Sequence, residues 1–429
     1  MAKRGTSKVT PRLRFPEFRS AKDWTTLELR QLSEFVTERV GTSDCTPYTV
    51  SSGVGLVSQQ EKLGRTIAGN SLKNYIVLQK NDFAYNKSAT KAFPQGFIAR
   101  YVGEDRAAVP NSIFTCFRTN EEVIDPAYLD NLFSTNLHGN WLRNRIAVGA
   151  RAHGSLNVSD EDLMDLLVPL PAGSSSFTEQ KRIADCLTSL DEVIAAQERK
   201  VEALKAHKRG LMHQLFPREG ETRPRLRFPE FRDAPEWEER RLDDFADISK
   251  GKGISKADIA IDGVTPCVRY GELYTIYGEI IDQVHSRTNV QPSELIFSEA
   301  GDVIIPGSGE TKEDIATCAV VLHGGVALGG DLNIIRADMD GRFFSYYLNG
   351  SKRRTLARVA QGDAVVHLYP RQLGKLKVSI PSKKAEQRRI ADLFSSLDAQ
   401  IAAETNQLAA LKTHKLGLMQ QLFPVPKGN

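Results

Sequence analysis

The sequence predicts an α+β protein in which two mixed α/β domains are joined by two long antiparallel coiled-coil helices, with a pseudo-twofold internal repeat. Two observations predict this fold. The nine-residue leader PRLRFPEFR occurs at 11–19 and again at 224–232. The segment EQKRIADCLTSLDEVIAAQ at Glu179–Gln197 returns as EQRRIADLFSSLDAQIAAE at Glu386–Glu404. Because the segments between the copies differ, two similar frames carry two different inserts.

The order of these segments predicts four regions. We expect a first α/β domain at 11–171, a first long helix at 178–217, a second α/β domain at 224–381 and a second long helix at 385–424. A chain of 429 residues is long enough for each domain to bury its own core.

Runs of apolar, β-branched and aromatic residues predict strands in both inserts. The turn-forming residues Lys80-Asn81-Asp82 and Ala300-Gly301-Asp302 stand beside two of these strands. The strands are expected at Tyr75–Gln79, Gly96–Tyr101, Val303–Pro306 and Ala319–Leu322. Each insert then closes with a helical stretch and a strand, at Asp125–Ala150 with Leu166–Pro171 and at Phe343–Asp363 with Leu376–Pro381. The inserts are therefore expected to share a fold plan.

The two long helices are predicted by apolar residues at heptad spacing. Each helix ends in Leu-Phe-Pro, where the proline stops the pattern, and spans about 39 residues or ~58 Å. A helix with one apolar stripe needs a partner, and two matching seams favour an antiparallel pair over a helix packed on its own domain. The seams run through Ile183, Leu187, Leu190, Ile194, Val201, Leu204, Leu211 and Leu215, and through Ile390, Phe394, Leu397, Ile401, Leu408, Leu411, Leu418 and Leu422.

Composition narrows the class of protein without naming a function. The chain is 41% apolar and 26% charged, and its net charge of +4 permits nucleic-acid binding without requiring it. Five dispersed cysteines fit a reducing compartment better than a disulfide framework or a zinc site. The basic N-terminus lacks the apolar core of a secretory signal, and no apolar run approaches the ~20 residues of a membrane span. A cytoplasmic protein without a membrane partner is expected.

Motifs that carry catalysis are missing from the sequence. The glycines at 250–253 and 306–309 lack the GxxxxGK[ST] spacing of a phosphate-binding loop and are interpreted as turn glycines. No Asn-Pro-Pro-aromatic tetrapeptide, no GxGxxG at the start of a helix and no HExxH motif occurs. His207 and His414 occupy matching positions off the helical seams. We therefore expect a non-catalytic chain that binds no metal and no cofactor.

Candidate DNA-binding residues gather at equivalent places in the two inserts. Lysine and arginine can clamp phosphates, whereas arginine, asparagine and glutamine can contact base edges. A solvated surface role stays open for any single one of them. In the first insert the candidates are Lys87, Ser88, Lys91, Arg143, Arg145, Arg151 and His153. In the second insert they are Lys250, Lys252, Lys312, Arg353, Arg354, Arg358 and Gln361.

The repeated frames resemble the specificity subunit of a Type I restriction–modification system. The resemblance covers nearly the whole chain, but within the inserts it is weak. Its motifs are the leader LRFPEF…W…L at Leu13–Leu29 and Leu226–Leu242, the joins VPLP…EQKRIADCLTSLD at Val168–Asp191 and VSIP…EQRRIADLFSSLD at Val378–Asp398, and the two tails ending in LFP.

This resemblance implies two target recognition domains, each recognising one half of a split, asymmetric site in double-stranded DNA. It also implies that two methyltransferase (modification) subunits dock on the helices and that motor–nuclease (restriction) subunits join for cleavage. S-adenosylmethionine, magnesium and ATP would then belong to those partners. If the helices set the distance between half-sites, their ~58 Å length limits the span to about 17 bp at ~3.4 Å per pair.

Three other classes of protein remain open on the sequence. The main alternative is a stand-alone DNA-binding or regulatory protein without enzyme partners, and an exposed apolar surface on the helices would count against it. A fused restriction–methylation enzyme is disfavoured by the missing motifs. A coiled-coil adapter for proteins alone would not explain why the inserts differ while the frames stay alike.

Overall fold

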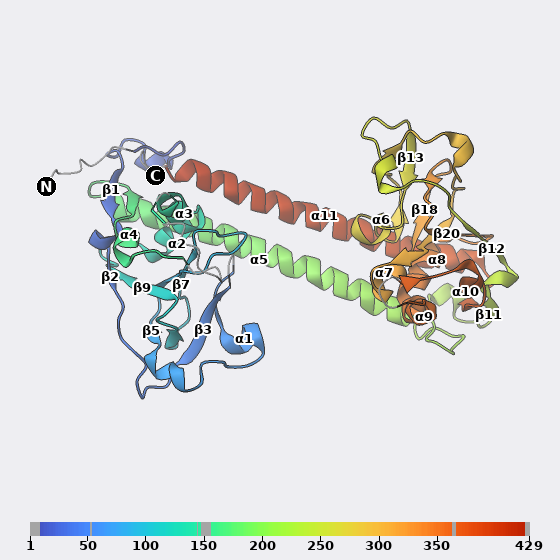
Figure 1. The fold of residues 1–429 in the computed structure, drawn as a ribbon, viewed down its shortest axis with the longest axis horizontal. Helices are drawn as coiled ribbons and strands as arrows, with labels where there is room; N and C mark the ends of the chain where they lie inside the picture. The colour runs from blue at the N-terminus through green and yellow to red at the C-terminus, as the bar shows by residue number, and fades with distance from the viewer. Residues whose placement is uncertain (1–8, 52–53, 144, 147–155, 363–365, 425–429) are drawn as a thin grey trace. The chain divides into compact units, whose positions relative to one another are not determined.

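The computed structural model describes all residues except 1–8, 52–53, 144, 147–155, 363–365 and 425–429. The chain forms two compact units. The first unit comprises Met1–Ala196 with Gln407–Asn429, and the second comprises Gln197–Asn406. The division crosses both long helices, α5 (Ser176–Leu215) and α11 (Lys384–Leu422). Each unit therefore contains one insert and a part of each helix (Figure 1).

The first unit combines short strands with short helices. Its strands are β1 (Thr25–Glu28), β2 (Ser33–Phe35), β3 (Thr46–Ser51), β4 (Gly55–Ser58), β5 (Ile76–Leu78), β6 (Phe83–Asn86), β7 (Phe97–Arg100), β8 (Ala107–Val109), β9 (Phe114–Thr119) and β10 (Leu167–Leu170). Its short helices are α1 (Gln59–Leu63), α2 (Pro126–Ser134), α3 (Leu137–Leu142) and α4 (Asp160–Met164).

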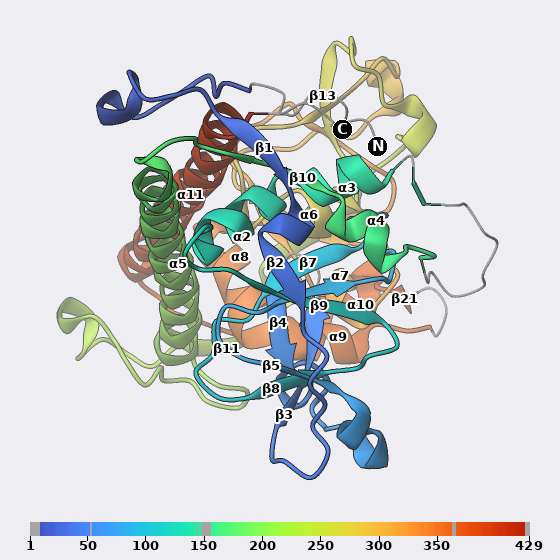
Figure 2. The same cartoon turned by 90° about the vertical axis from the view of Figure 1, so that its left-hand side faces the viewer.

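The strands of the first unit form three sheets. An antiparallel sheet has the order β2-β9-β6-β7, and a mixed sheet has the order β4-β3-β8-β5, in which β3 and β8 run parallel. Strand β1 from the leader pairs with the closing strand β10, so the two ends of the insert meet (Figure 2). The insert is thereby closed at the point where α5 begins.

The second unit has a similar mixture of elements. Its strands are β11 (Glu238–Arg241), β12 (Ala246–Lys250), β13 (Thr265–Val268), β14 (Ile280–Ile281), β15 (Ser286–Thr288), β16 (Val303–Pro306), β17 (Ser308–Gly309), β18 (Ala319–Val321), β19 (Ala327–Leu328), β20 (Leu332–Ala337), β21 (Val366–His367) and β22 (Lys377–Ile380). Its short helices are α6 (Glu272–Thr275), α7 (Lys312–Ile315), α8 (Gly341–Tyr347), the π-helical turn η8 (Leu348–Lys352), α9 (Arg353–Val359) and α10 (Pro370–Gly374).

The sheets of the second unit follow the strand order of the first. Strands β12-β20-β16-β18-β14 repeat the order β2-β9-β6-β7 with one strand added at the edge. Strands β15-β13-β19 repeat β4-β3-β8, including the parallel pair between β13 and β19. The leader strand β11 pairs with the closing strand β22. The two inserts share a plan although their residues differ.

Most strands predicted from the sequence are present in the structure. The stretches at 75–79, 96–101, 303–306 and 319–322 contain β5, β7, β16 and β18. The helical stretch expected at 125–150 is wrong in its continuity, because Asn136 takes a left-handed conformation (φ 63°) and separates α2 from α3. Its last residues, 147–150, lie outside the described residues. The stretch at 343–363 is helical as far as Val359, and the π-helical turn η8 lies within it between α8 and α9.

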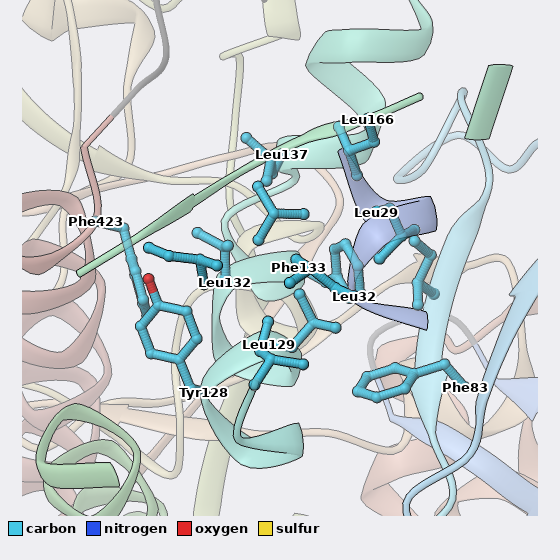
Figure 3. Close-up of a cluster of buried hydrophobic side chains, with 14 of the residues drawn as sticks. Leu29, Leu32, Phe83, Tyr128, Leu129, Leu132, Phe133, Leu137, Leu166 and Phe423 are labelled. Atoms are coloured by element: carbon cyan, nitrogen blue, oxygen red, sulfur yellow. The ribbon is translucent and has the colours of Figure 1, made fainter. Parts of the chain in front are cut away.

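The core of the first unit gathers side chains from the insert and from both long helices. Leu129, Leu132 and Phe133 of α2 are almost fully buried against Leu29 and neighbouring residues (Figure 3). The helix α11 closes this core with Phe423, whose ring lies 5.5 Å from that of Tyr128 in an edge-on arrangement. The Leu-Phe-Pro end of α11 is therefore part of the first unit's core.

The core of the second unit repeats this arrangement with the end of the other helix. Phe216, the residue directly after α5, contacts Tyr347 at 5.5 Å, Phe343 at 5.9 Å and Phe394 at 5.6 Å between ring centres. Edge-on and offset aromatic pairs of this kind add to the stabilisation that burial already gives. Each insert is thus covered by the start of one long helix and the end of the other.

A glutamate and a glutamine of α5 hold the first insert to the helix. Glu179 accepts hydrogen bonds from Arg14 Nε at 2.7 Å and from Trp24 Nε1 at 3.1 Å. The adjacent Gln180 accepts a hydrogen bond at 3.0 Å from the main-chain nitrogen of Asp125, the N-cap of α2. The carboxylate is 1% exposed, so the ion pair with Arg14 is buried. Its hydrogen bond raises the pKa of Arg14.

The same contacts recur in the second unit. Glu386 of α11 accepts hydrogen bonds from Arg227 Nε at 2.7 Å and from Trp237 Nε1 at 3.3 Å. Gln387 accepts a hydrogen bond at 3.1 Å from the main-chain nitrogen of Asp340, the N-cap of α8. The Arg-Trp-Glu contact joins residues that all belong to the repeated frames.

Within each unit, α5 and α11 are linked by side-chain contacts. In the first unit Lys415 Nζ lies 2.6 Å from an oxygen of Asp191. In the second unit Lys208 Nζ lies 2.6 Å from an oxygen of Asp398, and Gln197 donates to the main-chain oxygen of Glu404 at 2.9 Å. No helix among the described residues has the length and apolar character needed to cross a membrane.

Candidate nucleic-acid interface

In the first unit, Lys87 stands directly after β6 and is engaged by a carboxylate. Its Nζ lies 2.7 Å from Asp160 Oδ1, and Thr115 donates to the same oxygen at 2.6 Å. Burial raises the pKa of Asp160, but the hydrogen bonds from Lys87 and Thr115 outweigh it, and the pKa is lowered overall. The main-chain oxygen of Lys87 accepts a hydrogen bond from Leu156 at 2.8 Å. The ammonium group of Lys87 is therefore held in place by Asp160.

The neighbouring candidates Ser88 and Lys91 lie in the loop between β6 and β7. The main-chain nitrogen of Ser88 donates to Asn86 Oδ1 at 2.9 Å, and the side chain of Ser88 is half-buried. Lys91 is exposed at the turn that Thr90 and Phe93 close through main-chain and side-chain hydrogen bonds. The loop thus presents one cation, Lys91, to solvent.

The arginines after α3 differ in how firmly they are held. The guanidinium carbon of Arg145 lies 3.3 Å from the centre of the Trp141 ring, and Arg145 also donates to the main-chain oxygen of Trp141 at 2.6 Å. Trp141 in turn donates to the main-chain oxygen of Asp162 in α4 at 2.8 Å. Arg143 is exposed. Since Lys87 and Trp141 both contact α4, this helix brings the two candidate groups together. The candidates Arg151 and His153 lie outside the described residues.

The second unit builds its interface at the same place in the strand plan. Leu368 donates to the main-chain oxygen of Gly307 at 2.9 Å, as Leu156 does to that of Lys87. Strand β17 then pairs with β21, so that Ser308 lies opposite His367. This short pair precedes α10, whereas in the first unit the equivalent segment precedes α4. Different side chains therefore occupy matching positions in the two units.

Two predicted residues of the second unit meet around an exposed tyrosine. Lys250 Nζ lies 5.4 Å from the centre of the Tyr369 ring, and the His367 ring stacks on Tyr369 at 6.0 Å. Gln361 and His367 exchange two main-chain hydrogen bonds, at 2.9 and 2.6 Å. Tyr369 is 45% exposed. Sequence reasoning missed His367 and Tyr369, and the signal was present in the aromatic and basic residues of HLYPR at 367–371.

The remaining candidates of the second unit lie around α7 and α9. Lys312 opens α7, and Arg353 at the start of α9 donates to the main-chain oxygen of Glu313 at 3.3 Å. Arg353 and Arg354 are exposed. Arg358 forms an ion pair with Glu219, and this hydrogen bond lowers the pKa of Glu219. Of the three arginines, Arg358 is the one already matched by a carboxylate.

A glycine-rich loop next to Lys252 lines a cavity of about 750 Å³ in the second unit. Gly251 is required there, because a Cβ at this position would lie 2.1 Å from the main-chain oxygen of Gly329. Ile254, a β-branched residue, takes a positive φ of 59°, which is a strained conformation for such a side chain. Gly253 thus lines a cavity, and Gly251 packs against Gly329 of its wall, which the sequence alone did not indicate.

These arrangements suit contact with a polyanion. Lysine and arginine beside an exposed aromatic ring can pair with phosphates and stack on a base. Among the described residues, no three histidine, cysteine, aspartate or glutamate side chains are grouped so as to hold a metal ion.

Comparisons with known proteins identify relatives of this chain. Residues 235–413 match the family model of the Type I restriction modification DNA specificity domain. Two curated proteins of Methanocaldococcus jannaschii are similar to the chain. The Type I restriction enzyme MjaVIII specificity subunit is 21% identical over 332 residues, which cover 74% of each chain. The putative type I restriction enzyme MjaX specificity subunit is 23% identical over 332 residues, covering 76% of this chain and 74% of that protein.

A solved structure shares the fold. The crystal structure of the Type-I restriction-modification system S subunit from M. genitalium has a TM-score of 0.54 to this chain at 16% identity. The likeness covers 97% of this chain and 99% of that one. Mixed helix and sheet content, as the sequence predicts, is thus confirmed.

Proposed function

Since the chain belongs to the family of Type I restriction–modification specificity subunits, we propose that it selects the DNA sequence on which a Type I complex acts. In this proposal it contacts a bipartite, asymmetric site in double-stranded DNA and catalyses no reaction itself. S-adenosylmethionine, magnesium and ATP bind to the modification and restriction subunits, and the complex works in the cytoplasm.

One observation carries the proposal of an asymmetric, bipartite target. The two units have the same strand order, yet the positions that match in this order carry different chemistry. Lys87 paired with Asp160 occupies the place that Gly307 occupies in the second unit, where Lys250 and Tyr369 stand nearby. Two similar folds with different contact groups suit two different half-sites, as half-site spacing follows protein geometry in dimeric repressors.

The long helices are proposed to form an antiparallel coiled coil that relates the two target recognition domains by a pseudo-twofold axis. The contacts of the second unit support this, because α5 advances from Gln197 to Lys208 while its partners on α11 step back from Glu404 to Asp398. We further propose that modification subunits dock on these helices. The large apolar side chain of Val193, which is 49% exposed, supports this, since such surface is normally covered.

A methylome tests this function. The chain is co-expressed with its neighbouring modification subunit in an unmethylated host, and modified adenines are mapped by single-molecule sequencing. A split, asymmetric motif that disappears without this chain is expected. Stable co-purification of the two chains without any new motif would contradict the specificity role and favour an assembly role. No motif and no association of the two chains would favour a stand-alone protein.

Single substitutions then assign a half-site to each unit. Arg145→Ala is expected to weaken recognition of one half-site, and Arg353→Ala is expected to weaken recognition of the other. Each substitution is scored by the methylation of sites that carry one altered base pair in either half. The matched control is Arg358→Ala, whose smaller effect follows from its ion pair with Glu219. Equal losses at both halves from either substitution would contradict two separate readers.

A further inference from the structure

The tails of the two long helices differ at two positions only. HKRGLMHQLFP at 207–217 becomes HKLGLMQQLFP at 414–424, so that Arg209 corresponds to Leu416 and His213 to Gln420. The conserved positions are occupied by core and helix-pairing residues, such as Phe216 and Lys208. The two differing positions therefore give the second unit an arginine and a histidine where the first unit has a leucine and a glutamine.

Both of these residues line one cavity of the second unit. The cavity has a volume of about 530 Å³, and Arg209 and His213 face it from α5 together with Tyr274, Arg353 and Arg354. Residues four apart on a helix lie on the same face, which places Arg209 and His213 one above the other. In the first unit, by contrast, α3 has the sequence LHGNWL and supplies no arginine or lysine.

Asn349 and Gly350 of the π-helical turn η8 line this cavity. Gly350 of η8 lies against α5, where a Cβ would come within 3.0 Å of Met212 Cε and 3.3 Å of Phe216 Cδ2. The chain then continues into α9, whose first two residues are Arg353 and Arg354. π-Helical turns occur often at functional sites. Gly350 thus allows η8 to pack closely on α5, and Arg353 and Arg354 of α9 line the same cavity as Arg209.

The charges that face the cavity are predominantly positive. Its carboxylates are Glu279 and Asp314, and Glu279 is paired with Lys208 Nζ at 3.0 Å. Within the described part of the chain, Arg209, Arg353 and Arg354 form no salt bridge. An excess of guanidinium groups in a confined space favours an anion that can accept several hydrogen bonds, and phosphate is suited to this. Tyr274 adds an aromatic ring on which a base can stack.

We propose that this cavity binds the phosphate ester of a nucleotide, either a phosphodiester of the bound DNA or a free nucleotide. Arg209, Arg353 and Arg354 contact the phosphate, and Tyr274 borders the ring. In the DNA case the inference rests on the proposed function, whereas in the free-nucleotide case it stands independently.

The repeat itself supplies the test variant. Arg209→Leu with His213→Gln gives the first helix tail the residues of the second, which the same helical context already accommodates. The reciprocal change, Leu416→Arg with Gln420→His, is the matched control, because it adds the same residues in the first unit, whose short helices α2, α3 and α4 contain no arginine or lysine. Arg354→Gln tests the cavity from its other wall. All variants are made in the full-length chain.

Two measurements distinguish the two sources of phosphate. AMP and inorganic phosphate are tested by thermal melting, and a double-stranded oligonucleotide carrying the mapped target is tested by fluorescence anisotropy at several salt concentrations. If DNA is the source, the double variant and Arg354→Gln bind DNA about tenfold more weakly at every sequence. The slope of log K against log salt then falls by about 1 for each phosphate that the variant no longer neutralises.

If a free nucleotide is the source, AMP raises the Tm of the native chain and of the reciprocal control. It does not raise the Tm of the variant with Arg209→Leu and His213→Gln. Unchanged DNA affinity, unchanged salt slope and no effect of AMP or phosphate on the native chain would together overturn the proposal. If the native chain itself shows no sequence preference for DNA, the proposed function is overturned instead. The AMP measurement would still show whether the cavity binds a nucleotide.

Discussion

His138 of α3 is a neutral imidazole enclosed by the first unit. It is 1% exposed, its Nε2 donates to the main-chain oxygen of Gly96 at 3.3 Å, and its ring meets those of Tyr85 and Phe133 edge-on. Burial lowers the pKa of His138 to about 4, and the hydrogen bond to Gly96 opposes this only in part. Nδ1 has no hydrogen-bond partner among the described residues. Protonation therefore requires partial opening of the unit.

The first unit is expected to lose stability on mild acidification. The unfolded chain protonates His138 near its ordinary pKa of 6.5, whereas the folded chain does so only near 4. The contribution of neutral His138 to the free energy of unfolding is thus complete above pH 6.5. It falls by about 3 kcal/mol as the pH approaches 4. Urea unfolding at pH 7 and pH 4.5 measures it. In His138→Phe this part of the pH dependence should vanish, and an unchanged dependence in the variant would contradict the assignment.

The glutamates that hold the leaders are expected to be costly to remove. Glu386→Ala leaves the Arg227 side chain, which is 7% exposed, without its counter-charge, and should lower the free energy of unfolding by about 3–5 kcal/mol. Glu230→Ala is the control, because the pair between Glu230 and Arg389 is exposed and should cost less than about 1 kcal/mol. Urea unfolding compares the two. Similar losses in both variants would show that the buried pair is not decisive.

At the scale of elements, the long helices are joined by equivalent ion pairs in different surroundings. Lys208 is 11% exposed and contacts Glu279 as well as Asp398, while Lys415 is 19% exposed and contacts Asp191, which is 49% exposed. Burial raises the pKa of Asp398, and Lys208 counteracts this by stabilising the carboxylate. The two lysines therefore contribute differently to the free energy of unfolding, although they occupy matching positions.

Removing each lysine should reveal this difference. Lys208→Ala is expected to destabilise the second unit by about 3 kcal/mol, because two partly buried carboxylates lose their cation. Lys415→Ala is expected to cost about 1 kcal/mol or less in the first unit, since Asp191 keeps access to water. Differential hydrogen exchange of the two units measures both effects in one experiment. Equal effects, or a larger one for Lys415→Ala, would contradict this ranking.

Some secondary-structure elements could be predicted from the sequence alone, and others could not. The long helices were predicted because heptad spacing is a local pattern, and they extend from Ser176 to Leu215 and from Lys384 to Leu422. The break at Asn136 was not predicted, although asparagine adopts the left-handed conformation more readily than most residues. The π-helical turn η8 was not predicted either, because no local pattern in the sequence marks such a turn.

The candidate interface could be predicted only in part, for a similar reason. Composition drew attention to Lys87, Lys250 and the arginines of α9, but it could not show that Asp160 and Glu219 already pair with Lys87 and Arg358. Tyr369 and Arg209 were missed, because their partners are distant in sequence. In the case of Arg209, comparing the two tails position by position would have supplied the signal.

At the scale of the whole molecule, helix length is expected to determine the DNA between the half-sites. Inserting seven residues into α5 and seven into α11, level with the contact between Gln197 and Glu404, adds about 10.5 Å to each helix. This corresponds to about 3 bp at ~3.4 Å per pair. A methylome of this variant should show both half-sites unchanged and a longer unread spacer. Insertion into one helix alone is the control and should abolish methylation, and an unchanged spacer would contradict the prediction.

The contacts that hold each insert have a consequence for inheritance. Arg14, Trp24 and Glu179 all lie in repeated segments, and Gln180 meets the insert through a main-chain nitrogen, so these hydrogen bonds use no side chain of the insert. A gene that encodes such joints twice contains two stretches of similar coding sequence, at which homologous recombination can exchange one insert for another. Each exchange would leave the joints intact while replacing the interface, so a population of cells could acquire new DNA specificities without new folds.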